Sequence, residues 1–201
     1  MIISESRKTI YIAFPHTGST TIHDYCAGFD HLIIDDNALK HATVSQICDL
    51  GDYKEYKFYM FVRNPIDWIK SKWSMMCRIN LIGLKYIEKQ NVKQWRDECL
   101  ELYEKKPNFN EYANWFMFRH EKNNVSIFEY YIDQDCDITY LKFEDFETSC
   151  SVLFKALGIP KPLKYKRLNQ TQNNNIKVDN DTEKKLKNFF QEEISKFYNM
   201  E

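Results

Sequence analysis

Residues 9–21 are TIYIAFPHTGSTT, an apolar run that leads into a turn of small and hydroxyl-bearing residues. The β-branched and aromatic residues of Thr9–Phe14 predict a buried strand, bounded by Pro15. Ser19 or Thr20 can cap a helix that runs to about Gly28. A loop between a strand and a helix directs backbone N–H groups at one point, and the helix dipole adds partial positive charge there. The predicted anion-binding turn consists of Pro15, His16, Thr17, Gly18, Ser19, Thr20 and Thr21.

A second turn of the same layout follows another apolar run. Residues 57–62 (KFYMFV) predict a strand, and Arg63-Asn64-Pro65 comes directly after it, with the proline at a helix start where its missing N–H does no harm. The planar guanidinium of Arg63 suits a phosphate group, and Ser71 lies two helical turns into the helix. The alternative is that Arg63 pairs with a carboxylate and Ser71 is an ordinary surface serine. Two such turns together indicate a ligand with two separate anionic groups.

The first turn differs from the nucleotide-binding loop of kinases and NTPases. That loop ends in Gly-Lys-Ser/Thr, whereas Gly18 is followed by Ser19, so the lysine and a clear Mg²⁺-binding hydroxyl are missing. A small-molecule kinase therefore stays a disfavoured alternative.

The rest of the chain continues the alternation of strands and helices. Further strands are predicted at 31–34, 125–128 and 138–143, and further helices at 109–120, 147–157 and 182–198. One or two helices are predicted between 80 and 106. This order predicts an α/β protein, a three-layer sandwich with a central parallel sheet. We expect a single domain, 1–201, with a helical insertion on the acceptor side at about 80–107.

Composition excludes several classes of protein. The formal net charge is −1, so the chain is not built to coat nucleic acid or an anionic membrane. No stretch is long and apolar enough for a membrane span, and the N-terminus lacks the apolar region of a signal peptide. The six cysteines are scattered without a CxxC pair, which predicts reduced thiols and no metal site. We therefore expect a cytoplasmic protein.

Taken together, these motifs resemble the sulfotransferases that use 3′-phosphoadenosine 5′-phosphosulfate (PAPS), in particular the carbohydrate-type branch. The likeness rests on Pro15-His16-Thr17-Gly18-Ser19-Thr20 and on Arg63-Asn64-Pro65 with Ser71. It extends to Lys40–Thr43, Tyr140–Phe146, Leu157–Pro160 and Leu168–Thr171. The resemblance implies a P-loop NTPase-like sulfotransferase fold. It also implies that the first turn holds the 5′-phosphosulfate and that Arg63 and Ser71 hold the 3′-phosphate.

Two histidines are the catalytic candidates. The family has a lysine at the position of His16, where it contacts the bridging oxygen between phosphate and sulfate. An imidazole is only partly charged at neutral pH. His16 can donate one hydrogen bond to the leaving phosphate, or serve as an acid if its neighbours hold it protonated. The alternatives are that it marks a weakened or inactive enzyme, or that it only fills a loop position. His41 is the preferred general base, because some members that sulfate sugars have a histidine in this region. Its alternative role is that of a surface or capping residue.

The resemblance also sets the expected reaction and its partners. We expect transfer of a sulfuryl group to a hydroxyl or amine of a carbohydrate or other small molecule, with 3′,5′-adenosine bisphosphate as product. No nucleic acid and no membrane partner is expected. A non-catalytic module that binds a 3′,5′-bisphosphonucleotide is the main alternative, since His16 replaces the lysine.

Overall fold

The computed structural model describes residues 1–35, 39–82, 93–120, 126–162 and 176–198. The chain divides into two compact units. The first unit comprises Met1–Asn64 and Val125–Gln170, and the second comprises Pro65–Asn124 and Thr171–Asn199. This division into compact units does not test the single domain expected over 1–201, which stays a prediction. Each unit is described by itself.

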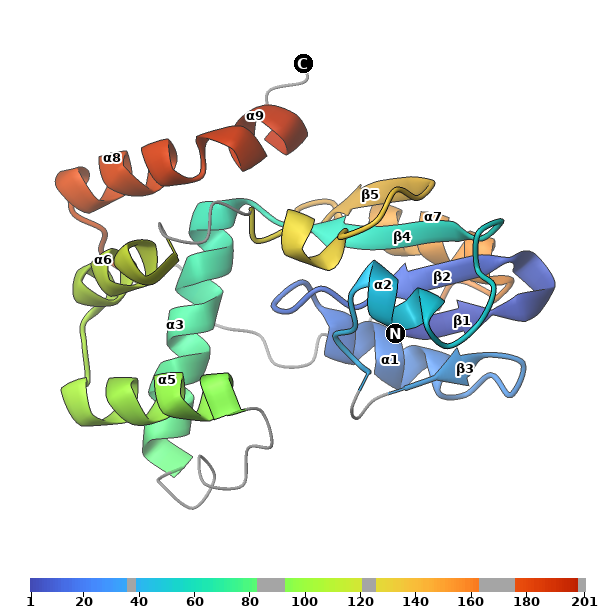
Figure 1. The fold of residues 1–201 in the computed structure, drawn as a ribbon, viewed down its shortest axis with the longest axis horizontal. Coiled ribbons are helices and arrows are strands. Elements are labelled where there is room, and N and C mark those ends of the chain that lie inside the picture. The colour runs from blue at the N-terminus through green and yellow to red at the C-terminus, as the bar shows by residue number, and fades with distance from the viewer. Residues whose placement is uncertain (36–38, 83–92, 121–125, 163–175, 199–201) are drawn as a thin grey trace. The chain divides into compact units, whose positions relative to one another are not determined.

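The first unit is built on a mixed sheet (Figure 1). In the described part of the chain this sheet has five strands, in the order β3-β1-β2-β4-β5. They are β1 (Ile2–Ser4), β2 (Thr9–Ile12), β3 (Ile33–Ile34), β4 (Lys57–Val62) and β5 (Ile138–Lys142). Strands β2, β4 and β5 are parallel, whereas β1 runs antiparallel to both of its neighbours. The α/β class is thus confirmed, and the purely parallel sheet is wrong.

The antiparallel strand follows from a short connection. The chain passes from β1 to β2 through the 3₁₀ turn η1 (Glu5–Arg7) and Lys8, which has a left-handed φ of 45°. A link of this length makes β1 and β2 antiparallel, because parallel neighbouring strands need a crossover connection of a dozen or more residues. Ile2 pairs with Tyr11, and both side chains are fully buried. The sequence prediction missed β1 because three residues are too few to show a period.

Helices lie on both faces of this sheet. Figure 1 shows α2 (Val44–Cys48) on one side and α7 (Phe146–Leu157) on the other. On the side of α7, α1 (Ser19–Cys26) contributes Ile22 and Cys26 to a core that also contains Tyr11 and Phe61. On the opposite side, Phe14 packs against Phe128 with 4.8 Å between ring centroids. The carboxyl ends of β2 and β4 therefore emerge from a well-packed core.

One predicted strand is wrong. Residues 125–128 were expected to be extended, yet Ser126–Phe128 form a turn that leads into the 3₁₀ helix η3 (Glu129–Tyr131), and residue 125 lies outside the described part. The Ser126 hydroxyl accepts hydrogen bonds from the N–H groups of Phe128 and Glu129. A serine that satisfies nearby backbone groups in this way favours a turn over a strand.

The second unit is helical in its described residues. It contains α3 (Pro65–Ile82), α5 (Lys93–Lys105), α6 (Phe109–His120), α8 (Asn180–Phe189) and α9 (Gln191–Tyr198). The predicted helices at 109–120 and 182–198 are confirmed, the latter as two helices. Of the region expected to be helical between 80 and 106, residues 83–92 lie outside the described part. No described helix is long and apolar enough to cross a membrane.

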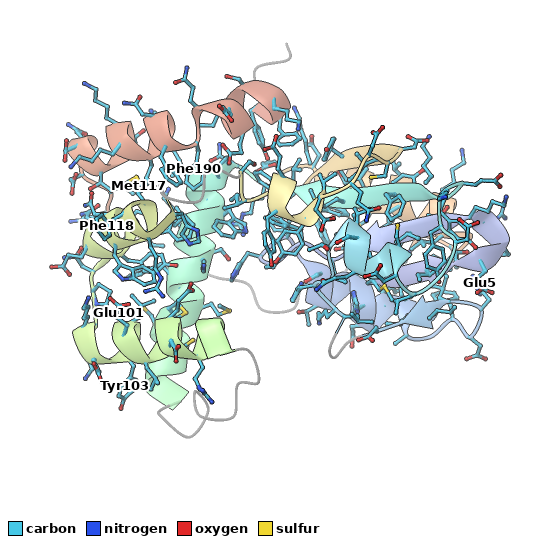
Figure 2. All side chains as sticks on the ribbon, viewed as in Figure 1. Glu5, Glu101, Tyr103, Met117, Phe118 and Phe190 are labelled. Carbon is cyan, nitrogen blue, oxygen red and sulfur yellow. The ribbon has the colours of Figure 1, made fainter. Side chains whose placement is uncertain are left out.

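Aromatic side chains hold the second unit together. Phe116 of α6 packs against Trp68 of α3, with 5.9 Å between ring centroids, and against Phe190, 6.4 Å away. Phe190 directly follows α8 and is labelled in Figure 2. His120 stacks on Phe116 at 4.2 Å, one helical turn further along α6. Burial, together with the charges of Lys72 and Arg119, lowers the pKa of His120 to about 4. This histidine is therefore neutral in the folded protein at ordinary pH.

Candidate functional site

The first predicted turn has the backbone of an anion-binding loop. His16 and Gly18 both adopt left-handed conformations, with φ of 63° and 78°. Gly18 is the N-cap of α1, and no described side chain caps this helix. The buried Thr17 hydroxyl donates to the Phe14 carbonyl at 2.6 Å and so holds the turn closed. Left-handed residues before a helix N-terminus form a concave row of N–H groups, which suits an anion.

Gly18 is required at its position for two reasons. A φ of 78° is strained for residues with a Cβ. In addition, a Cβ at Gly18 would lie 2.6 Å from Phe146 Cε2 and 3.3 Å from Phe143 Cε2. These two rings, from α7 and from the residue after β5, form a wall against which the turn packs.

The second turn contacts the first through its arginine. Arg63 Nη1 donates to the His16 carbonyl at 2.9 Å. Arg63 Cζ lies 4.5 Å from the ring centroid of Phe143, so the guanidinium stacks on that ring. The next N–H, of Asn64, donates to Glu144 Oε1 at 2.7 Å. Because β2 and β4 are parallel neighbours, both turns lie at the same edge of the sheet.

His41 reaches the same edge from the loop before α2. Its Nδ1 is hydrogen-bonded to the Ala13 carbonyl, directly before the first turn. Since a carbonyl accepts, Nδ1 carries the proton, and in a neutral ring Nε2 then holds the lone pair. The residue is exposed. Its geometry is that of a histidine able to take a proton through Nε2.

Helix α2 is fixed just after His41. Thr43 caps it in a reciprocal arrangement with Gln46, and the N–H of Ser45 donates to Asp133 Oδ1 at 2.8 Å. The Ser45 hydroxyl also donates to Asp133. Although burial acts in the opposite direction, these hydrogen bonds hold the pKa of Asp133 below its ordinary value. A carboxylate from the segment before β5 thus fastens the helix that follows His41.

Most of the predicted site residues come together in the first unit. The turn at residues 15–21, Arg63 and His41 are linked by hydrogen bonds to the carbonyls of Ala13 and His16. Ser71 is different, because it is a buried residue of α3 in the second unit. Its predicted partnership with Arg63 stays a prediction. The matching segment Leu168–Thr171 lies outside the described residues.

Sequence reasoning missed three residues that shape this site: Phe143, Phe146 and Asp133. The first two belong to Tyr140–Phe146, a stretch noted for its family likeness, in which neither phenylalanine was given a role. Asp133 carries no local signal, because its partner Ser45 is 88 residues away.

Comparison with known proteins gives no family. No family model, no curated protein and no solved structure matches the chain. Among the described residues, no group of three or more histidine, cysteine, aspartate or glutamate side chains is placed to hold a metal ion. The function is therefore argued from the geometry of this site.

Proposed function

We propose that the chain is a PAPS-dependent sulfotransferase. The observation that carries the proposal is the contact between the two turns, in which Arg63 donates to the His16 carbonyl at 2.9 Å. This contact brings a guanidinium next to a concave row of N–H groups, and together these groups can bind a ligand with two anionic groups. PAPS has this character, with a 5′-phosphosulfate and a 3′-phosphate.

Each residue has a definite part in the proposed reaction. The N–H groups of residues 17–21 and the hydroxyls of Ser19, Thr20 and Thr21 bind the 5′-phosphosulfate, and Arg63 binds the 3′-phosphate, with Ser71 predicted as its partner. His16 donates to the bridging oxygen between phosphorus and sulfur. His41 Nε2 takes the proton of the acceptor hydroxyl while that oxygen attacks sulfur. The bond from sulfur to the bridging oxygen breaks, and its electron pair leaves on 3′,5′-adenosine bisphosphate.

The acceptor is proposed to be a sugar or another small molecule with a hydroxyl or amine. This part of the proposal rests on the resemblance to the carbohydrate-type branch and on the exposed position of His41.

The first test is a thermal-shift titration with 3′,5′-adenosine bisphosphate, set against AMP, ADP and ATP with Mg²⁺. A ligand that binds the native state at 100 times its Kd stabilises it by about 2.7 kcal/mol. We expect the bisphosphate to stabilise the protein most. Stabilisation by ATP with Mg²⁺ instead would favour a kinase, and no response to any nucleotide would refute the proposed cofactor site.

Turnover needs a second test. Wild-type protein is incubated with PAPS labelled in the sulfuryl group and a panel of sugars and amines, beside His41→Gln and Arg63→Ala. We expect label transfer by the wild type, loss of turnover with nearly unchanged bisphosphate affinity in His41→Gln, and at least roughly tenfold weaker bisphosphate binding in Arg63→Ala. Selective binding without transfer to any acceptor would favour the non-catalytic binding module.

A further inference from the structure

We propose that Phe143 is a positioning residue that fixes the guanidinium of Arg63 beside the first turn and thereby sets selectivity for a ligand with a second anionic group. The inference rests on the proposed function, because it assumes that the turn at 15–21 holds the 5′ group of a nucleotide. Neither the sequence motifs nor the resemblance assigned a role to Phe143.

Two contacts restrain Arg63 in different ways. The stack on Phe143, 4.5 Å from Cζ to the ring centroid, fixes the plane of the guanidinium. The hydrogen bond from Nη1 to the His16 carbonyl, 2.9 Å long, fixes its rotation within that plane. An arginine side chain otherwise has many rotamers, and ordering it for each ligand costs free energy. With both contacts in place, the guanidinium has one orientation before any ligand arrives.

Phe143 is itself held by backbone and ring contacts. Its N–H donates to the Val62 carbonyl at 2.8 Å, directly before Arg63. Its ring lies against Phe146, with centroids 5.6 Å apart, and near Gly18. The parallel register of β4 and β5, which pairs Val62 with Lys142, therefore places Phe143 beside Arg63. Phe143 is thus a rigid support for the arginine.

This arrangement bears on selectivity. A guanidinium carries five N–H donors in one plane, so a fixed plane allows it to bond to the His16 carbonyl and to a phosphate at the same time. If the ring is lost, the arginine keeps its charge but loses its orientation. The loss should therefore weaken a ligand that reaches Arg63 and leave a ligand that occupies the first turn alone nearly unchanged.

The experiment compares Phe143→Leu, Phe143→Tyr and Phe146→Leu with the wild type. Phe143→Tyr keeps the stacking ring, and Phe146→Leu removes the other ring beside Gly18. Calorimetric titration measures the Kd of each protein for 3′,5′-adenosine bisphosphate and for AMP. We expect Phe143→Leu to weaken the bisphosphate roughly three- to tenfold with little change for AMP. Phe143→Tyr should retain wild-type selectivity, and Phe146→Leu should change both affinities by the same factor.

A ligand-free measurement separates this inference from the proposed function. Unfolding of wild type, Phe143→Leu, Arg63→Ala and the double variant gives the coupling between the two side chains. We expect a coupling of about two- to fivefold in the folding equilibrium constant. An unchanged ratio of the two Kd values in Phe143→Leu, or an absent coupling, overturns the inference. If the wild type binds neither nucleotide, the proposed function and the selectivity both fail, and retained coupling then supports the positioning of Arg63 alone.

Discussion

At the scale of single residues, the first turn depends on a glycine that no other residue replaces well. Gly18→Ala should destabilise the protein by about 1–3 kcal/mol, because its φ is left-handed and the new Cβ would meet the Phe146 ring. It should also abolish stabilisation by 3′,5′-adenosine bisphosphate. Gly28→Ala is the matched control, since the nearest atom to its Cβ is 3.8 Å away. Chemical denaturation measures both variants, and equal stabilities would contradict the assigned strain.

A histidine of the second unit makes a separate prediction about pH. The pKa of His120 falls from an ordinary 6.5 to about 4 in the folded protein. Between these values the unfolded chain binds a proton that the folded chain does not. The free energy of unfolding should therefore decrease as pH falls from about 6.5 to about 4. His120→Phe keeps the stack on Phe116 and should flatten this dependence.

The pH dependence of unfolding can be measured for the second unit separately. All four tryptophans (Trp68, Trp73, Trp95 and Trp115) belong to it, so their fluorescence during denaturation reports its unfolding. The control is His31→Phe, which replaces an exposed histidine of the first unit. An identical slope with pH in wild type and His120→Phe would mean that His120 is not a buried neutral group.

At the scale of elements, α2 is short and depends on contacts from elsewhere. Five residues make a marginal helix, so the hydrogen bonds from Ser45 to Asp133 matter for where His41 lies. Asp133→Asn keeps the size of the side chain but removes its charge, which weakens these bonds. If the proposed function holds, turnover should fall several-fold while the bisphosphate Kd stays unchanged. Asp135→Asn, two residues along the same segment, is the control, and a matched loss in both variants would argue against the role of Asp133.

The elements also show what sequence could predict. The bounds of β4 and α6 match the prediction because a continuous apolar run and a dense aromatic pattern each mark one element clearly. Helix α2 was missed although its capping residues, Thr43 and Gln46, are three positions apart as in a capping box. The two turns were predicted because each one lies in a continuous stretch of sequence that contains a strand, a turn and a helix start. The stack of Arg63 on Phe143 and the contact of Ser45 with Asp133 were not predicted, because each joins residues about 80 or more positions apart in the sequence.

At the scale of the whole molecule, the two units should respond differently to a nucleotide. Hydrogen exchange followed by mass spectrometry, with and without 3′,5′-adenosine bisphosphate, measures this response. We expect slower exchange at residues 15–21 and 63–64, where the ligand would order the backbone. The helix α8, far along the sequence, serves as the internal reference. Protection confined to other segments would place the nucleotide site elsewhere.

The pairing of β4 with β5 also affects how the chain folds during translation. Asn64 bonds to Glu144, 80 residues later, and the second unit's residues 65–124 are synthesised between them. Closing a loop of that length costs about 4 kcal/mol in chain entropy before the strands bond. During translation, β4 is thus an open strand edge until β5 leaves the ribosome. The wall behind the first turn comes later still, with Phe146. The nascent chain therefore carries the anion-binding motif long before it has the complete site, and an unpaired strand edge is prone to mispairing in that interval.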